Sequence, residues 1–341
     1  MLFRSGDIRK TFGRYLSDEI VATLLENPEG LKMGGERRRI TIFTSDLRGF
    51  TATSERLSPE EVVKILNFYL GYMADVITKY QGTIDEFMGD GILVLFGAPI
   101  ARENDAQRAI ACGVAMQQAM IPVNEQMKKW NLPPLEMGIG INTGEVVVGN
   151  IGSEKRTKYG IVGSQVNLTY RIESYTNGGQ ILISEETLKE AGDMVKIDGQ
   201  KQVQPKGVKK PITIYDVGGI GGEYNLYLTK EEEVFVRLKD AISIQYVSLA
   251  GKDVGKEKTR GTIFKLSAKE AQVRCDDRDY IIPAPLTNVK LNFLWNGEAS
   301  EDVYAKVIEK QAENGSFYIH FTAKPPDVNA KLASLYDSLL K

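Results

Sequence analysis

The sequence predicts an α+β protein built from two domains. Its 341 residues correspond to roughly two domains of about 150 residues each. From residue 37 onward, strand-like and helix-like segments follow one another in the order β-α-β-β-α-β, which predicts helices packed on a sheet. Beyond a run with four glycines in five residues, Gly218–Gly222, short β-branched segments separated by turn residues predict a small β-barrel or sandwich that ends in one helix.

The N-terminal residues 1–36 contain one short predicted helix. Ser17 precedes its apolar segment and can accept hydrogen bonds from the first amides of the helix. A single short helix buries too little surface to fold alone. We therefore expect residues 1–36 to be a connecting segment rather than a domain.

The first predicted domain covers residues 37–217 and opens with a strand at 38–46. A long amphipathic helix follows this strand. Ser58 caps the helix, Pro59 occupies its first turn and Glu61 supplies the acid of a capping box. These residues make the first β-α step of the domain.

Two strands joined by a short turn come next. Segments 83–88 and 92–96 flank the turn Gly89–Gly91, so they predict a hairpin. A second long helix starts near Asn104 or Asp105, and a further strand closes the split unit. This order of elements is that of a ferredoxin-like fold.

The second predicted domain covers residues 228–341 and is separated from the first by a glycine-rich linker at 218–227. Its short strands predict a six-stranded β-barrel. The apolar periodicity of residues 328–340 predicts the terminal helix.

The composition excludes several classes of chemistry. Lys and Arg number 43 against 45 Asp and Glu, a net charge of -2, so no bulk positive field exists to gather nucleic acid. The single histidine, His320, excludes histidine-based zinc sites and Ser-His-Asp triads unless that one residue serves them. Any chemistry is therefore expected to use carboxylates, amides and cations.

Cysteine usage and hydropathy indicate the compartment. Cys112 and Cys275 lie far apart and form neither a metal-binding spacing nor a disulfide framework, which fits a reducing cytosol. The longest strongly apolar stretch, 91–100, is about half as long as a membrane helix, and the N-terminus has no signal-peptide core. We expect a cytoplasmic protein without a membrane segment in this chain.

Two aspartates are the first candidates for chemistry. Asp46 ends the first strand and Asp90 lies in the hairpin turn, so neighbouring strands would bring both carboxylates to one sheet edge. Mg²⁺ prefers oxygen ligands, and phosphoryl-transfer enzymes commonly use two such cations. The alternative is a strand-end cap and an ordinary turn aspartate.

Further candidates could hold phosphate and sugar groups. A turn after Asp46 leads toward a helix, and its backbone amides could cradle a phosphate. The turn residues are Arg48, Gly49, Phe50 and Thr51. Asn167 and Arg171 lie four apart on one predicted helix and project from one face, although the spacing taken alone favours an ordinary solvated helix face. Lys206 lies in a loop rich in cations.

Residues 36–217 resemble the catalytic domain of the class III nucleotide cyclases, the adenylyl and guanylyl cyclases. Four blocks at the family's spacing carry the resemblance: ITIFTSDLRGFT, TIDEFMGDGILVLFGAP, GINTGEVVVGNIGS and YGIVGSQVNLTYRIES. The resemblance covers the whole first domain in order. The N-terminal segment also resembles the piece that joins sensor modules to such cyclases, so we expect an upstream sensor domain or a protein partner in a longer chain.

The resemblance implies metal and substrate roles. Asp46 and Asp90 match the aspartates that bind two divalent cations, Mg²⁺ or Mn²⁺, and the carbonyl of Leu47 matches a further ligand. In the family, the 3′-hydroxyl of the substrate attacks the α-phosphorus and pyrophosphate leaves.

The resemblance also implies a shared site. Asn167 and Arg171 match the ribose-orienting and transition-state residues, and Lys206 matches the lysine that holds the terminal phosphates. In the family, the metal aspartates of one protomer face these residues of the other. Every matched residue is present in this chain, so we expect a homodimer with two sites.

The base-reading positions favour GTP. Glu86 falls where guanylyl cyclases carry glutamate, and an ionised carboxylate accepts the N1–H and amino donors of guanine. Strand alternation places Glu86 on the face opposite to Asp85. The second base-reading position is Gly160, which has no side chain, so backbone or water must complete recognition and ATP remains a possible side substrate.

The C-terminal domain resembles a PilZ domain in its strand rhythm. PilZ domains bind cyclic di-GMP through R-x-x-x-R and a later [DN]-x-S-x-x-G. Here Arg237 is followed four residues later by Ala241, and only Ser267 survives of the second motif. We expect no binding of cyclic di-GMP and a role in dimerisation or partner contact, with a passive stabilising barrel as the alternative.

The sequence thus predicts a guanylate cyclase that converts GTP to 3′,5′-cyclic GMP and pyrophosphate at a homodimer interface. Two alternatives remain. One is an adenylate cyclase that converts ATP to cyclic AMP, and the other is a catalytically silent nucleotide-binding regulatory module.

Overall fold

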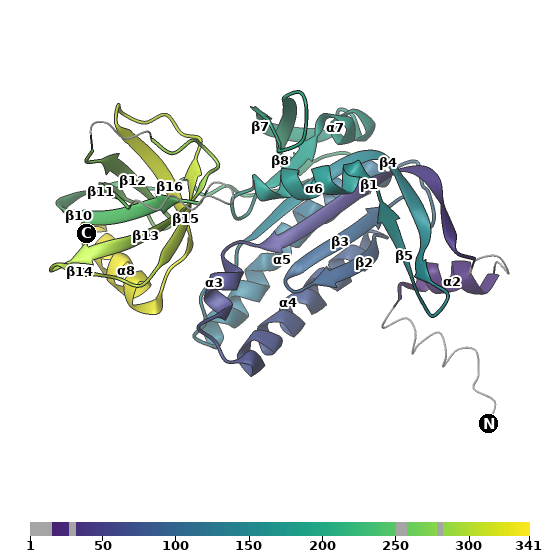
Figure 1. Cartoon of the computed structure of the whole chain (residues 1–341), viewed down its shortest axis with the longest axis horizontal. Helices are drawn as coiled ribbons and strands as arrows, with labels where there is room; N and C mark the ends of the chain where they lie inside the picture. The colour runs from purple at the N-terminus through teal and green to yellow at the C-terminus, as the bar shows by residue number, and fades with distance from the viewer. Residues whose placement is uncertain (1–15, 27–31, 250–257, 278–281) are drawn as a thin grey trace. The chain divides into compact units, whose positions relative to one another are not determined.

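The computed structural model describes residues 16–26, 32–249, 258–277 and 282–341 (Figure 1). They divide into two compact units. The first unit comprises the chain up to Leu47 together with Val63–Leu228, and the second comprises Arg48–Val62 and Thr229–Lys341. Residues 1–15 and 27–31 of the predicted connecting segment lie outside the described residues.

A mixed sheet forms the first unit. Its strands are β1 (Gly34–Leu47), β2 (Thr83–Met88), β3 (Gly91–Phe96), β4 (Met137–Ser153), β5 (Arg156–Val162), β6 (Ile181–Ser184), β7 (Val195–Val203), β8 (Ile212–Ile220) and β9 (Leu226–Tyr227). The order is β2-β3-β1-β4-β6-β8-β7, with β5 on β4 and β9 on β8. Only β4 and β6 run parallel among these pairs. The predicted hairpin is confirmed as β2 and β3.

The helices of the first unit are α2 (Asp18–Glu26), α4 (Pro59–Lys79), α5 (Asp105–Lys129), α6 (Ser164–Ser174) and α7 (Glu185–Ala191). The first turn of α4, up to Val62, groups with the second unit. The predicted capping box of α4 is confirmed, because the Ser58 amide donates to Glu61 Oε2 at 3.0 Å and the Glu61 amide donates to Ser58 Oγ at 3.2 Å. Along the described ranges, no helix is both long enough and apolar enough to cross a membrane.

The two faces of β4 receive different helices (Figure 1). Ile139 and Ile141 are fully buried, and a methyl group on Gly113 of α5 would lie 3.7 Å from Ile141 Cδ1. Gly140 points the other way, where a Cβ would lie 2.5 Å from the backbone nitrogen of Glu173 in α6. A glycine in β4 thus allows α6 to approach the sheet closely.

The second unit is largely an antiparallel β-barrel. Its elements are α3 (Phe50–Ser54), β10 (Val236–Ser248), β11 (Thr259–Leu266), β12 (Glu270–Cys275), β13 (Asn288–Trp295), β14 (Glu298–Ala299), β15 (Val303–Ile308), β16 (Ser316–Ala323) and α8 (Pro326–Leu340). Strands follow the order β10-β11-β12-β16-β15-β13, and β13 pairs back with β10 to close the ring. Val328 and Leu332 of α8 join the barrel core. The predicted six-stranded barrel with a terminal helix is confirmed.

Gly140→Ala should destabilise the protein by about 1–3 kcal/mol, because the added methyl group overlaps the backbone of Glu173 and overpacks a close contact. Urea unfolding followed by circular dichroism measures the change. Gly71→Ala at an exposed position of helix α4 is the matched control: apart from the helix's own backbone and the chain neighbours, no atom of the described residues lies within 4 Å of the added Cβ, so alanine should stabilise by up to about 1 kcal/mol. Equal effects of the two substitutions would contradict the close packing of α6.

Candidate active site

Two acidic side chains meet at the end of β1. Asp46 is the penultimate residue of this strand, and Asp90 lies in the turn between β2 and β3. The backbone amide of Leu47 donates to Asp90 Oδ2 at 3.0 Å, which ties the turn to the strand. Gly89 supports the turn with a φ of 63°, a conformation that favours glycine. Asp46, Leu47 and Asp90 are therefore brought together, as the neighbouring strands predict.

The electrostatics of this pair are unfavourable without a counter-charge. Burial, with repulsion from Asp46 as the next cause, raises the pKa of Asp90 to about 6. The Leu47 amide opposes this shift but does not cancel it. A cation bound between Asp90 and its neighbour Asp46 would neutralise the negative charge that burial and repulsion disfavour on Asp90.

The donor set at β1 fits a hard divalent cation. Carboxylate oxygens of Asp46 and Asp90 and the carbonyl of Leu47 are the ligand types that Mg²⁺ and Mn²⁺ accept. Among the described residues, no group of three or more His, Cys, Asp or Glu side chains gathers to form a complete cage. Mg²⁺ held by one or two carboxylates usually takes further ligands from substrate phosphates and water.

A second charged cluster joins β2 to β5. Lys158 Nζ lies 3.0 Å from Asp85 Oδ2 and 3.0 Å from Glu86 Oε2. Burial lowers the pKa of Lys158, but its two carboxylate partners outweigh burial and leave the pKa raised. The lysine therefore stays charged and holds Glu86 beside β5.

The expectation that Asp85 and Glu86 lie on opposite faces of the strand is wrong. The β2–β3 register shifts between Ile84 and Glu86, which is the signature of a β-bulge at Asp85. Because a bulge breaks the alternation, both carboxylates reach the same lysine. Sequence alternation alone cannot reveal this arrangement.

Lys158 and Asp85 were not among the residues selected from the sequence. Lys158 stands two residues before Gly160 on β5, so both lie on one face of that strand. That spacing was a usable signal for Lys158. No comparable signal marks Asp85, whose position depends on the bulge.

Helix α6 presents the predicted polar pair. Asn167 is exposed and Arg171 half-buried, one turn apart on the helix. A methyl group on Gly207, whose φ is 83°, would lie 3.5 Å from Arg171 Nη1. The loop that carries exposed Lys206 therefore lies beside the Arg171 guanidinium.

The predicted phosphate-binding turn belongs to the second unit. Gly49 adopts a φ of 68° and leads into the short helix α3, whose first residue, Phe50, is buried. Arg48 and Thr51 flank these positions. A Cβ on Gly49 would overlap the carbonyl of Thr322, so this turn requires glycine.

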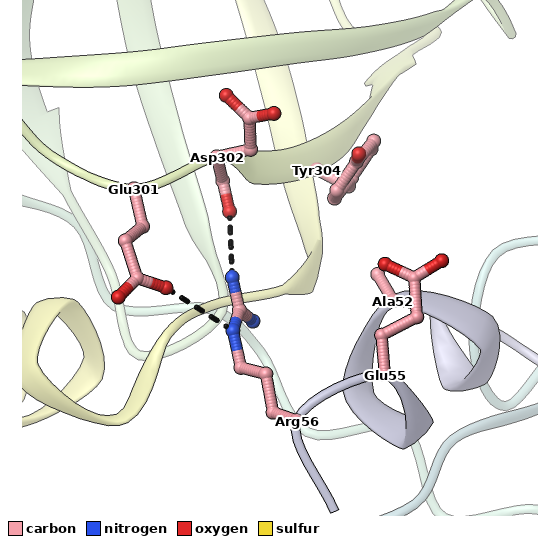
Figure 2. Close-up of a pocket in the computed structure, with 6 residues that line it drawn as sticks. All are labelled: Ala52, Glu55, Arg56, Glu301, Asp302 and Tyr304. Atoms are coloured by element: carbon pink, nitrogen blue, oxygen red, sulfur yellow. Dashed lines mark hydrogen bonds and ion pairs between the residues drawn. The ribbon is translucent and has the colours of Figure 1, made fainter.

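A pocket of about 380 Å³ lies in the same unit (Figure 2). Its lining residues are Ala52, Glu55, Arg56, Glu301, Asp302 and Tyr304. Arg56 donates to the Asp302 carbonyl at 3.2 Å and pairs with Glu301 at 3.3 Å, as Figure 2 shows. No predicted site residue lines this pocket.

Comparison with known families identifies the first domain. Residues 35–219 match the family model described as the adenylate and guanylate cyclase catalytic domain. The chain is 31% identical over 219 residues to adenylate cyclase 1 of Rhizobium meliloti (strain 1021), covering 64% of this chain and 33% of that protein. It is 33% identical over 220 residues to an adenylate cyclase of Anabaena cylindrica, covering 61% of this chain and 42% of that protein. The chain thus spans less than half the length of these curated relatives.

Solved structures give a similar result. This chain is 71% identical in sequence to the protein in the crystal structure of the guanylyl cyclase Cya2. The TM-score is 0.57, and the match covers 58% of this chain and 100% of that chain. The adenylyl cyclase CyaB from P. aeruginosa is 39% identical, with a TM-score of 0.54 and coverage of 57% and 100%.

Asp90→Asn should stabilise the metal-free protein by an amount on the order of 1 kcal/mol at pH 8 and by less at pH 4. The folded pKa of Asp90, about 6, lies above the ordinary value of 3.8, so its contribution to stability is greatest below pH 4 and is lost as the pH rises to 6. Asparagine keeps an acceptor for the Leu47 amide but carries no charge. Urea unfolding in a chelator across this pH range tests the effect, and a pH-independent difference between the two proteins would contradict it.

Proposed function

The chain belongs to the adenylate and guanylate cyclase catalytic domain family, and we propose that it is a guanylate cyclase that converts GTP to 3′,5′-cyclic GMP and pyrophosphate. The observation that carries the proposal is the contact of Glu86 with Lys158 at 3.0 Å. An ionised carboxylate only accepts hydrogen bonds. Such a group suits the donor edge of guanine and repels the N1 acceptor of adenine.

Lys158 adds a second preference for guanine. Its ammonium carries three donors, and two of them face the carboxylates of Asp85 and Glu86. The third can face the O6 acceptor of guanine, where adenine carries an amino donor instead. The 71% identity to the guanylyl cyclase Cya2 supports the same choice.

The end of β1 is proposed to hold the two divalent cations. Asp46 and Asp90 would supply carboxylate oxygens and Leu47 its carbonyl. Bound Mg²⁺ or Mn²⁺ supplies the Lewis acidity that lowers the pKa of the 3′-hydroxyl and neutralises phosphate charge. The turn from Arg48 to Thr51 is proposed to contact the phosphates through its backbone amides.

Helix α6 and the following loop are proposed to act on the sugar and the developing charge. Asn167 would orient the ribose, Arg171 would stabilise charge on the α-phosphate as the bond to the 3′-oxygen forms, and Lys206 would hold the departing pyrophosphate. The position of Gly207 beside Arg171 supports a joint role for this loop and the helix.

Each site is proposed to be shared by two copies of this chain. One protomer supplies Asp46 and Asp90, and its partner supplies Glu86, Asn167 and Arg171. Because every residue is present in one chain, a symmetric homodimer carries two complete sites.

An adenylate cyclase and a silent nucleotide-binding module are the two alternatives to a guanylate cyclase. An adenylate cyclase is favoured by the names of the curated relatives at 31% and 33% identity. A silent nucleotide-binding module would show binding without product.

The C-terminal barrel is proposed to be a PilZ-like domain that does not bind cyclic di-GMP and serves dimerisation or partner contact.

Asp46→Ala and Arg171→Ala should each reduce cyclic GMP formation by more than about a hundredfold, since each removes a group from every site. Mixing equal amounts of the two variants should restore about a quarter of wild-type activity. Half of randomly formed dimers are mixed, and each mixed dimer has one intact site of two. Product chromatography measures the recovery.

The exposed Asp75→Ala on α4 serves as the control for this experiment and should retain full activity. Two inactive variants that stay inactive after mixing and subunit exchange would contradict a shared site. Wild-type activity in Asp46→Ala would contradict the metal assignment.

Glu86→Lys should lower kcat/KM for GTP by at least about tenfold, because an ammonium replaces the acceptor for the guanine donors and also repels Lys158. The relative preference for ATP should rise. Initial rates with each nucleotide alone, for wild type and variant, measure this shift. An unchanged GTP preference would show that Glu86 does not select the base.

A further inference from the structure

Asp85 carries a buried oxygen that the protein itself does not satisfy. Its side chain is only 3% exposed, and Oδ2 accepts from Lys158 at 3.0 Å. Oδ1 is buried and has no hydrogen-bond partner among the described residues. Most buried polar atoms are paired, so this oxygen calls for a physical explanation.

The unpaired oxygen faces the position that lacks a side chain. A Cβ placed on buried Gly160 would lie 3.6 Å from Asp85 Oδ1 and 4.0 Å from Lys158 Cε. Apart from the chain neighbours of Gly160, no other atom of the described residues would lie within 4 Å of it. Asp85 Oδ1 therefore lies next to Gly160, the second base-reading position. The side chain of Lys158 lies beside both residues.

The buried, unpaired oxygen of Asp85 destabilises the free protein. Burial raises the pKa of Asp85, although Lys158 opposes the shift. An unsatisfied buried acceptor carries a desolvation cost that a donor from a ligand can remove. The side chain of Lys158 is 47% exposed, so its long flexible methylene chain can shift and admit such a donor while the ammonium stays beside the two carboxylates.

Building on the proposed function, we infer that Asp85 is a second specificity-determining carboxylate of the base pocket, whose Oδ1 accepts a hydrogen bond from the 2-amino group of guanine through the space left by Gly160. Asp85 thereby replaces the missing side chain at position 160.

The donor count of guanine agrees with two carboxylates. Its Watson–Crick edge offers the N1–H and one hydrogen of the 2-amino group, and the second amino hydrogen points toward the N3 side, so the base carries three donors here. Glu86 can accept the N1–H and one amino hydrogen side by side, as carboxylates accept paired donors. The second amino hydrogen then needs another acceptor, which Asp85 Oδ1 supplies.

Inosine triphosphate isolates this contact. It keeps the N1–H and O6 of GTP but lacks the 2-amino group. Asp85→Asn should lower the ratio of kcat/KM for GTP to kcat/KM for inosine triphosphate by at least about tenfold. Lys158 holds the amide oxygen of the new asparagine, so its NH₂ group takes the place of Oδ1 and faces the amino donors of guanine.

A second variant alters the same contact by a substitution on β5. Gly160→Ser places a hydroxyl close enough to donate to Asp85 Oδ1, so it should lower the GTP to inosine triphosphate ratio in the same direction. Asp75→Asn is the matched control. It makes the same change of side chain as Asp85→Asn at an exposed position of α4 outside the proposed base pocket, so both the activity and the ratio should stay within about twofold of wild type.

The outcomes separate this inference from the proposed function. If Asp85→Asn slows both nucleotides equally, Asp85 only positions Lys158 and the inference is overturned. If the wild-type chain cyclises neither nucleotide, the proposed function fails instead. The ratio of dissociation constants for GTP and inosine triphosphate, measured by calorimetric titration of wild type and Asp85→Asn, then decides whether Asp85 reads the amino group.

Discussion

Repulsion between two carboxylates at the end of β1 is the constraint on which the rest of the site depends. The Leu47 amide fixes Asp90 close to Asp46, and burial together with repulsion from Asp46 raises the pKa of Asp90 to about 6. The negative charges of such a pair repel each other, and a divalent cation that also binds a polyphosphate can neutralise them. The sheet order β2-β3-β1 produces this arrangement, because the hairpin turn and the end of β1 come to the same edge.

The proposed base selection depends on a different interaction, in which one lysine holds two carboxylates. Lys158 lies 3.0 Å from both Asp85 and Glu86, so in the proposed pocket two acceptors and one cation would face the nucleotide base. Adenine would meet mismatched groups at both N1 and N6, whereas guanine would find partners for its donors and for O6. In this proposal the missing side chain at Gly160 contributes to recognition, because it leaves space beside Asp85.

The sequence predicted those features that depend on local patterns. The capping box of Ser58 and Glu61, the hairpin around Asp90 and the six-stranded barrel follow from short-range spacing, and the structure confirms them. The contact between β2 and β5 could not be predicted, since it joins residues more than seventy positions apart. Alternation also failed at Asp85, because a bulge changes the face that a side chain occupies.

The most direct test of the account is a competition in one reaction. The purified chain is given equal concentrations of GTP and ATP with Mn²⁺ or Mg²⁺, and the products are separated by chromatography. Predominant cyclic GMP is the result that a Glu86–Lys158 base pocket predicts. Predominant cyclic AMP would leave the fold and the family unchanged but would contradict the assignment of Glu86, Lys158 and Asp85 as the groups that select the base.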